Sequence, residues 1–274
     1  MINANKTLSL AIMSGKGGVG KTNLSLNLSY ALNAGGNSLL LMDCDLGLAN
    51  LDVLLGISPE TNMQDLLTSG AKPSDIVIPI EKGKKFDILP AASGVPELVE
   101  MDDDMQELLF SKITKLVGGY QYLVLDLGAG INGTVMSFAS MTQMRIVVIT
   151  PEPTSLTDSY ALIKVLHSQH NVSDFNVIVN QASNEKEARS TFDRLNMACE
   201  KFLNIKLKNM GYVRYDPTVT EAVRRQIPFI KFAPKSEASR DILNIAVKIQ
   251  KIRMENMGKL SEKPVIKKFP TLAD

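Results

Sequence analysis

The fold of this chain is decided by the stretch G-K-G-G-V-G-K-T at residues 15–22. It matches G-x-x-x-x-G-K-[ST], a pattern in which glycine-rich backbone surrounds the phosphates of a nucleotide. The glycines allow backbone angles that side chains forbid, so their N–H groups can converge on phosphate oxygens. The pattern assigns Lys21 to the β- and γ-phosphates and the Thr22 hydroxyl to Mg²⁺.

The flanking sequence has the order that such a loop requires. Residues 7–14 read TLSLAIMS, an apolar run of strand length, and Leu24, Leu28 and Leu32 repeat at a helical spacing. The helix N-terminus then points its positive dipole end at the phosphates, which a chance glycine-rich turn would not do. The expected nucleotide-binding residues of the loop are Gly15, Gly17, Gly18, Val19, Gly20, Lys21, Thr22 and Asn23.

The length and composition of the chain indicate a globular protein with a large core. Of 274 residues 45% are hydrophobic, and the net charge of +1 argues against a generally cationic nucleic-acid binder. Cys44 and Cys199 are too few for a disulfide framework or a metal cage. The N-terminus lacks a signal-peptide pattern, and no apolar run approaches ~20 residues. We therefore expect a cytoplasmic protein.

Apolar runs alternate with helical patterns, which predicts an α/β fold: a single P-loop NTPase domain, its mostly parallel sheet having helices on both faces. We assign this domain to residues 1–257 and expect residues 258–274 to be a loosely held tail that makes weak contacts with a membrane or a partner. The expected strands are 7–14, 38–43, 86–89, 122–127, 145–150, 176–180 and 208–213, and the expected helices are 23–34, 105–117, 154–167, 185–203 and 237–257.

Two of the predicted strands end in carboxylates. The run SLLLMD is followed by Cys44 and Asp45, and YLVLD ends at Asp126. Residues two apart in an extended chain point to the same side, so Asp43 and Asp45 can act together. One carboxylate can serve the metal or Lys21, and the other can orient an attacking water. A solvated turn is the alternative for an acidic pair seen in isolation.

The base is expected to be adenine. A common guanine reader needs Asn-Lys-x-Asp after a strand, whereas residues 180–183 read NQAS and have no acid at the fourth place. Asn180 can still hydrogen-bond an adenine edge, and a turn cap is the alternative role for this residue.

The chain resembles the MinD/ParA ATPases, whose deviant phosphate loop carries an additional lysine where this chain has Lys16. Within that family it is most similar to the flagellar-number regulators of the FlhG/FleN group. The resemblance covers about residues 7–250. It is carried by DCDLGLANLDVLLG (43–56), PAASG (90–94) and TPEPTSLTDSYALIK (150–164).

The resemblance implies an ATPase switch that dimerises with ATP, hydrolyses it slowly and regulates flagellar number or placement. Lys16 would reach across a homodimer to the partner's phosphates, as an arginine finger does. Lys16, Lys21 and Asp45 would be the catalytic residues, and Asp45 would position the hydrolytic water. Mg²⁺ would be served by Thr22 and Asp126, with Asp43 nearby.

The resemblance also implies the contacts around this centre. Glu152 and Asp158 would lie on the dimer face, and Asp158 would hold Lys16 when ATP is absent. Asn180, Arg214, Tyr215 and Asp216 would surround adenine. The implied partners are a flagellar GTPase and flagellar switch or transcription-regulator proteins, with no specific nucleic acid. Leu127, at a place where Thr or Ser is usual, and Arg214, where Pro is common, depart from the family pattern.

Relatives attach to membranes through a C-terminal amphipathic helix. Ile242, Ile245, Ile249 and Ile252 give residues 240–257 one apolar stripe, which suits either a lipid surface or packing on the sheet, and we favour packing. From the stretch VIKKF at 265–269 we expect weak, ATP-dependent binding to an anionic surface at the inner face of the cell membrane.

Two other classes compete with the flagellar switch. One is a DNA-partitioning ATPase of the ParA kind, which would bind DNA in a salt- and ATP-dependent way. The other is a metabolic P-loop enzyme, such as a ligase that phosphorylates a small acid, which would need a further substrate pocket.

Overall fold

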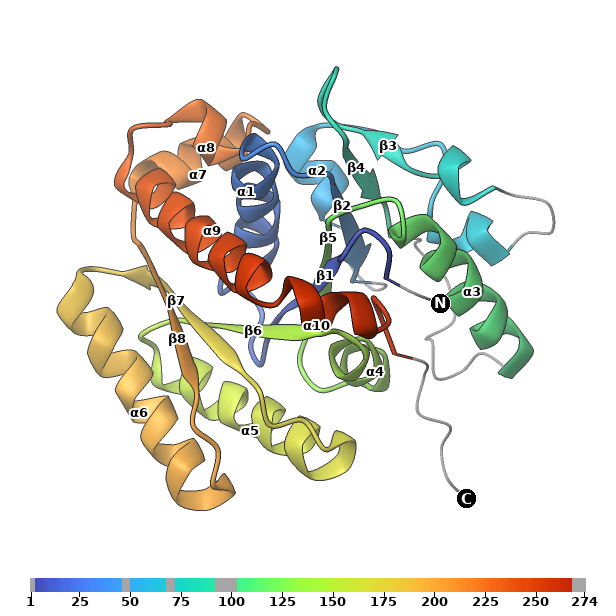
Figure 1. The fold of residues 1–274 in the computed structure, drawn as a ribbon. Coiled ribbons are helices and arrows are strands. Elements are labelled where there is room, and N and C mark those ends of the chain that lie inside the picture. Colours follow the sequence, from blue (N-terminus) through green and yellow to red (C-terminus); the bar gives the residue numbers. More distant parts are fainter. Residues whose placement is uncertain (1–2, 46–49, 68–71, 92–102, 268–274) are drawn as a thin grey trace.

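The computed structural model describes residues 3–45, 50–67, 72–91 and 103–267 of the chain. Their centre is an eight-stranded sheet with the order β3-β4-β2-β5-β1-β6-β7-β8 (Figure 1). Neighbouring strands run parallel, except that β3 is antiparallel to β4. The strands are β1 (Leu8–Ser14), β2 (Leu39–Cys44), β3 (Ile78–Pro79), β4 (Phe86–Leu89), β5 (Tyr122–Ala129), β6 (Met144–Ile149), β7 (Asn176–Ala182) and β8 (Lys208–Arg214).

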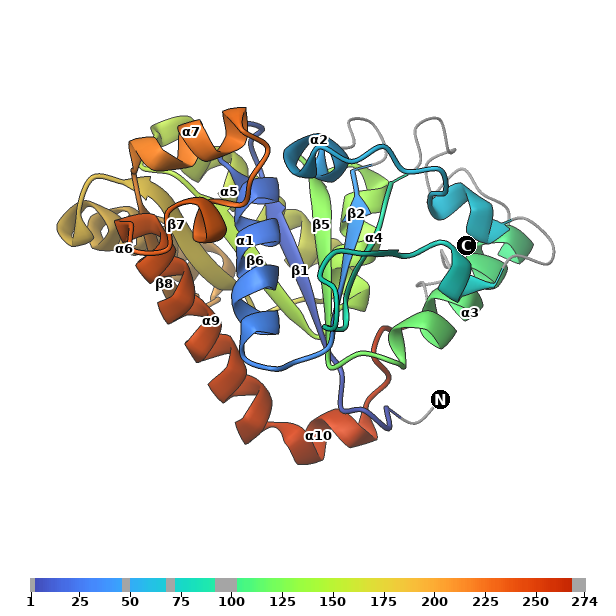
Figure 2. The ribbon, with the colours of Figure 1, turned by 90° about the horizontal axis from the view of Figure 1, so that it is seen from above.

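Helices cover both faces of this sheet, as Figures 1 and 2 show. One face carries α1 (Lys21–Ala34), α7 (Pro217–Arg224), α8 (Phe229–Phe232) and α9 (Glu237–Glu255). The other face carries α3 (Asp103–Val117), α4 (Gly133–Met141), α5 (Pro153–His170) and α6 (Glu185–Leu203). The remaining helical segments are α2 (Leu51–Leu55), α10 (Met257–Glu262) and the 3₁₀ turns Met63–Leu67 and Pro73–Asp75.

The central strands are apolar on both sides because they contribute to two cores. In β1, Leu10 and Ile12 pack on the α1 side, whereas Ala11 and Met13 pack on the side of α4 and α5. A parallel sheet buried on both faces needs this continuous apolar run rather than an alternating one. The predicted fold class, the seven predicted strands and the five predicted helices are confirmed, with ends that shift by a few residues.

The sequence patterns missed the short elements. Helix α4 is buried on most of its surface, so its sequence has no polar stripe to reveal the helical period. Strand β3 has two residues, too few to show any period. The two short helices α7 and α8 follow β8, where Asp216 caps the first of them by accepting the Thr218 N–H at 2.9 Å.

The amphipathic helix near the C-terminus packs on the sheet, which confirms the favoured interpretation. In α9, Ile242, Ile245 and Ile249 are buried in the core beside α1. Arg253 is also buried; its guanidinium lies over the Tyr122 ring and donates to the carbonyl oxygens of Asn5 and Lys6. The stripe is therefore part of the domain core. None of the described helices is long and apolar enough to cross a membrane.

The expectation of a loose tail is wrong as far as residue 267. Helix α10 follows α9 at the end of the sheet where β1 begins (Figures 1 and 2), and its Leu260 is buried. Beyond it, Val265 and Ile266 join the core, and the Val265 carbonyl accepts the Ser9 hydroxyl at 2.6 Å. These two apolar side chains are thus not available as a lipid anchor. Residues 268 and 269 of the expected anchor lie outside the described residues.

Removing the packed C-terminal segment should destabilise the domain. Deleting residues 258–274 exposes the sites of three buried apolar side chains, so we expect the free energy of unfolding to fall by on the order of 4 kcal/mol. Deleting only residues 268–274, which leaves these three side chains in place, is the matched control. Urea unfolding followed by circular dichroism measures both, and equal stability of the two truncations would contradict the packing seen here.

Candidate functional site

The phosphate loop joins β1 to α1 at the carboxyl end of the parallel strands. Gly18 and Gly20 adopt positive φ angles of 78° and 84°, the left-handed conformation that side chains disfavour. Gly15 serves a different purpose, because a Cβ atom there would lie 2.2 Å from the carbonyl carbon of Asp158. The start of the loop therefore packs directly against the backbone of α5.

Asn180 holds the other side of the loop. It is 7% exposed at the end of β7, and its Nδ2 donates to the Val19 carbonyl at 2.7 Å. A Cβ atom on Gly20 would lie 2.5 Å from the same nitrogen. The structure gives Asn180 a role as a brace of the loop, and its contact with adenine stays a prediction. The sequence indicated this role only by placing a polar residue, Asn180, near the end of a predicted strand.

Lys21 and Asp126 form a buried ion pair beneath the loop. Lys21 Nζ lies 3.2 Å from Asp126 Oδ1, and the Ser25 hydroxyl donates to the same oxygen at 2.8 Å. Ser25 was not among the predicted site residues, although it lies one helical turn after Lys21 on α1. Asp126 Oδ2 is buried and has no hydrogen-bond partner among the described residues.

This arrangement fits Mg²⁺. The orphaned Oδ2 of Asp126 needs a partner, and Thr22 begins the same helix as Lys21. Within the described ranges no group of three or more His, Cys, Asp or Glu residues could hold a metal alone. Mg²⁺ usually keeps several waters and binds through one or two protein oxygens and substrate phosphates. Thr22 and Asp126 would hold it here, and it would neutralise charge on the phosphates.

Asp43 lies next to Asp126 on the adjacent strand. The register of β2 and β5 pairs these two residues, and Asp43 is 1% exposed. Its carboxylate accepts backbone N–H groups from Asp45 at 3.0 Å and from Asn50 and Leu51 at 3.4 Å each. Burial, and then the charge of Asp126, raise the pKa of Asp43 from 3.8 to about 7. Asp43 therefore binds the backbone at Asp45 and at residues 50 and 51.

Asp45 is carried to the same edge. It is half-buried, and a Cβ atom on Gly128 would lie 3.4 Å from its Oδ1. Its carboxylate thus lies beside Gly128, near the end of β5 and two residues after Asp126. The structure brings together the three predicted carboxylates of β2 and β5.

Lys16 points away from the cradle. Its Nζ contacts Glu152 Oε2 at 2.5 Å and Thr154 Oγ1 at 2.9 Å, both at the start of α5. The expectation that Asp158 holds Lys16 is wrong, because Asp158 lies a turn further along α5, where its backbone meets Gly15. Lys16 is 36% exposed, so its charge lies at the surface and is held by its own chain.

The residues at the end of β8 and directly after it have different roles. The Arg214 guanidinium binds Asp241 in a bidentate pair, with both distances 2.8 Å, and reaches Glu237 at 2.7 Å. The Arg214 side chain is therefore bound to α9. Asp216 caps α7, whereas the Tyr215 ring is 64% exposed and accessible to a base.

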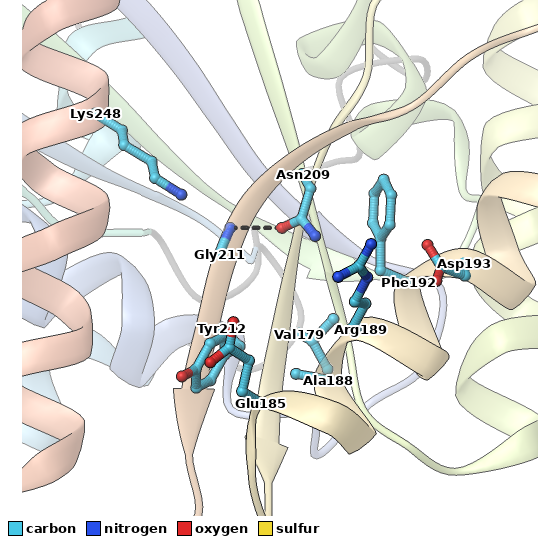
Figure 3. A pocket seen from close by; sticks show the side chains of 10 residues that line it. All are labelled: Val179, Glu185, Ala188, Arg189, Phe192, Asp193, Asn209, Gly211, Tyr212 and Lys248. Atoms are coloured by element: carbon cyan, nitrogen blue, oxygen red, sulfur yellow. Dashed lines mark hydrogen bonds between the residues drawn. The ribbon is translucent and has the colours of Figure 1, made fainter.

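A separate groove of about 430 Å³ lies beyond this site, along the outer edge of β8 between α6 and α9 (Figure 3). Side chains form hydrogen bonds with backbone groups of this edge. Lys248 Nζ donates to the Met210 carbonyl at 3.0 Å, and Asn209 Oδ1 accepts the Gly211 N–H at 2.8 Å. Such contacts protect an edge strand from pairing with another chain. The groove is not part of the nucleotide site.

Comparison with known proteins agrees with this geometry. The family model described as ParA, the NUBPL iron-transfer P-loop NTPase, matches residues 5–250. The chain belongs to the ParA family. Among curated relatives, the antiactivator FleN of Pseudomonas aeruginosa is 37% identical over 88% of this chain and 85% of its own length. The flagellum site-determining protein YlxH of Helicobacter pylori is 34% identical over 89% and 82%.

Solved structures extend the likeness to three dimensions. The cell division protein MinD of Aquifex aeolicus aligns with a TM-score of 0.72 at 26% identity, covering 89% of this chain and 97% of its own. MinD of Pyrococcus horikoshii, complexed with Mg-ADP, aligns with a TM-score of 0.68 at 25% identity, covering 90% and 97%. This ParA-family chain is accordingly a P-loop ATPase that uses ATP with Mg²⁺.

Replacing Gly15 should disturb the loop before any ligand is bound. In Gly15→Ala the new methyl group would overlap the α5 backbone, and we expect a loss of about 1–3 kcal/mol in the free energy of unfolding. Gly17→Ala is the matched control, since no atom lies within 4 Å of its Cβ position. Thermal unfolding of the nucleotide-free proteins compares them, and equal losses would show that α5 does not pack on Gly15.

Stability of the nucleotide-free protein should depend on Asp43. Its raised pKa means that the folded protein keeps a proton that the unfolded chain has lost, so the free energy of unfolding should fall as pH rises from about 4 to about 7. The slope contributed by this residue is at most about 1.4 kcal/mol per pH unit. Urea unfolding at several pH values should show a shallower fall in Asp43→Asn, and identical slopes would refute the assignment.

Proposed function

We propose that this chain is a nucleotide-controlled switch that regulates flagellar number or placement. In this proposal ATP joins two copies, hydrolysis separates them, and the dimer presents the surface that partners recognise. The similarity to FleN and YlxH over most of the chain supports the flagellar role. A flagellar GTPase and flagellar switch or transcription-regulator proteins are the partners that we propose.

The position of Lys16 is the observation that carries the switch. The cradle already has its lysine, because Lys21 lies beneath the loop next to Asp126. Lys16 extends to the surface, where Glu152 and Thr154 hold it. A half-exposed cation that is bound by α5 would be available to a partner's phosphates, where it would stabilise charge that develops in phosphoryl transfer. Chemistry and assembly would then depend on one another.

Each other residue has a task in this scheme. Lys21 binds the β- and γ-phosphates, and Asn180 keeps the loop in shape from behind. Asp45 orients the water that attacks the γ-phosphate, and Tyr215 is placed to contact the base. Glu152, which is exposed at the start of α5, and Asp158, in the second turn of that helix, would face the second copy.

The packing of the C-terminal segment changes what we expect of membrane attachment. Because Val265 and Ile266 are buried, binding through this segment would require it to leave the core. The packed state does not offer the anchor that the sequence suggested.

The switch predicts opposite behaviour for two variants. Asp45→Ala should slow hydrolysis by about 100-fold while ATP still drives dimerisation, because only the water loses its orienting group. Lys16→Ala should lose both ATP-dependent dimerisation and hydrolysis but still bind ATP, because Lys21 is intact. Lys82→Ala, an exposed lysine far from the loop, is the charge-matched control and should behave like the unmodified protein.

Size-exclusion chromatography with light scattering and a phosphate-release assay measure these outcomes. A monomeric Asp45→Ala protein with ATP bound would contradict the switch. Normal dimerisation and turnover of Lys16→Ala would remove the role assigned to Lys16. Flagella counted by electron microscopy in the native host, with Lys16→Ala replacing the natural chain, test the cellular role; unchanged number and placement would contradict it.

A further inference from the structure

A second polar pocket lies at the opposite end of the sheet from the phosphate loop. It has a volume of about 440 Å³ and forms where α4, α5 and α6 end and where β6, β7 and β8 begin. Its charged lining consists of Arg145, Lys206, Lys208, Lys267 and Asp174. Nothing in the ATPase cycle uses these residues.

The lining carries more positive charge than the local structure requires. Four cations face one carboxylate, although the net charge of the entire chain is only +1. Lys208 Nζ lies 2.7 Å from Asp174 Oδ1, so these two neutralise one another. Three cations remain.

Helix C-termini account for part of this surplus. Each helix end carries the equivalent of about −0.5 charge, so the ends of α4, α5 and α6 together supply about −1.5. A positive balance of about +1.5 is left for a ligand. The pocket is therefore more basic than helix capping alone explains.

Arg145 gives the pocket a fixed hydrogen-bond donor. Its side chain is 7% exposed, and its Nε donates to the Ala139 carbonyl at 2.9 Å. Its Nη2 donates to the carbonyls of Ser140 and Thr142. Nη1 has no hydrogen bond to any residue that the structure describes. A planar guanidinium held in place by its other nitrogens is suited to binding phosphate oxygens.

Lys206 and Lys267 supply exposed charge around this fixed donor. Both side chains are exposed, and within the described ranges neither ammonium group has a carboxylate within ion-pairing distance. They come from distant parts of the chain, one after α6 and the other after α10. Only the packing of the C-terminal segment brings Lys267 to this pocket, through the hydrogen bond from its N–H to the Met141 carbonyl at 3.0 Å.

We propose that this pocket binds the phosphate group of a polyanionic ligand. Arg145 Nη1 donates to the phosphate oxygens, and Lys206 and Lys267 close around them. The volume is within the range of small-ligand sites. The same chemistry describes a free phosphate compound and the headgroup of an anionic lipid, and the two sources are separated by experiment.

The test uses the full chain saturated with Mg-ADP, so that the phosphate loop is already filled. Pyrophosphate titrated by calorimetry probes free phosphate, and flotation with phosphatidylglycerol vesicles, compared with phosphatidylcholine vesicles, probes lipid. The variant is Lys206→Ala/Lys267→Ala, which leaves the packed Arg145 in place. The charge-matched control is Lys82→Ala/Lys164→Ala, two exposed lysines that do not line the pocket.

We expect the pocket variant to lose pyrophosphate affinity, or flotation on anionic vesicles, by about tenfold, while the control changes by less than about twofold. Binding of pyrophosphate alone assigns the site to free phosphate compounds, and flotation alone assigns it to lipid headgroups. Failure of both probes to bind, or equal loss in pocket and control variants, overturns the proposal. ATP-dependent dimerisation of the pocket variant should be unchanged, so this result is independent of the switch.

Discussion

The buried ion pair between Lys21 and Asp126 is the interaction on which the rest of the site depends. Both side chains are removed from water, and a buried charge without its partner is strongly destabilising, by about 3–5 kcal/mol. The pair fixes α1 to β5 and sets the height of the phosphate loop above the sheet. It also defines what a nucleotide changes, because phosphates would give Lys21 a new partner and free Asp126 for the metal.

Asp43 makes this arrangement sensitive to its surroundings. Burial, and then the charge of Asp126 on the adjacent strand, raise the pKa of Asp43. The segment after β2 depends on the same carboxylate for its backbone hydrogen bonds. A metal ion next to Asp126 would add positive charge and relieve the repulsion. Metal binding would thus change the charge around Asp43, whose carboxylate accepts the Asp45 N–H.

The phosphate loop packs against protein on both sides. Helix α5 contacts Gly15 through its backbone and holds Lys16 through Glu152 and Thr154. Asn180 supports the opposite side from β7. A movement of α5 would therefore alter both the loop and the exposed lysine, which links the cradle to the surface that a second copy would meet. The two ends of the sheet differ in chemistry, since carboxylates gather at the nucleotide end and cations at the other.

The sequence by itself determined the phosphate loop, the alternation of strands and helices, and the carboxylates at the ends of β2 and β5. These features follow from local patterns: backbone freedom at glycines, apolar runs, and residues placed directly after a strand. Tertiary structure alone decided that Asn180 braces the loop, that Ser25 shares Asp126, that Glu152 rather than Asp158 holds Lys16, and that residues 258–267 pack into the core. Each of these outcomes joins residues more than 100 positions apart. Such contacts depend on how the strands are ordered in the sheet, which no local pattern encodes.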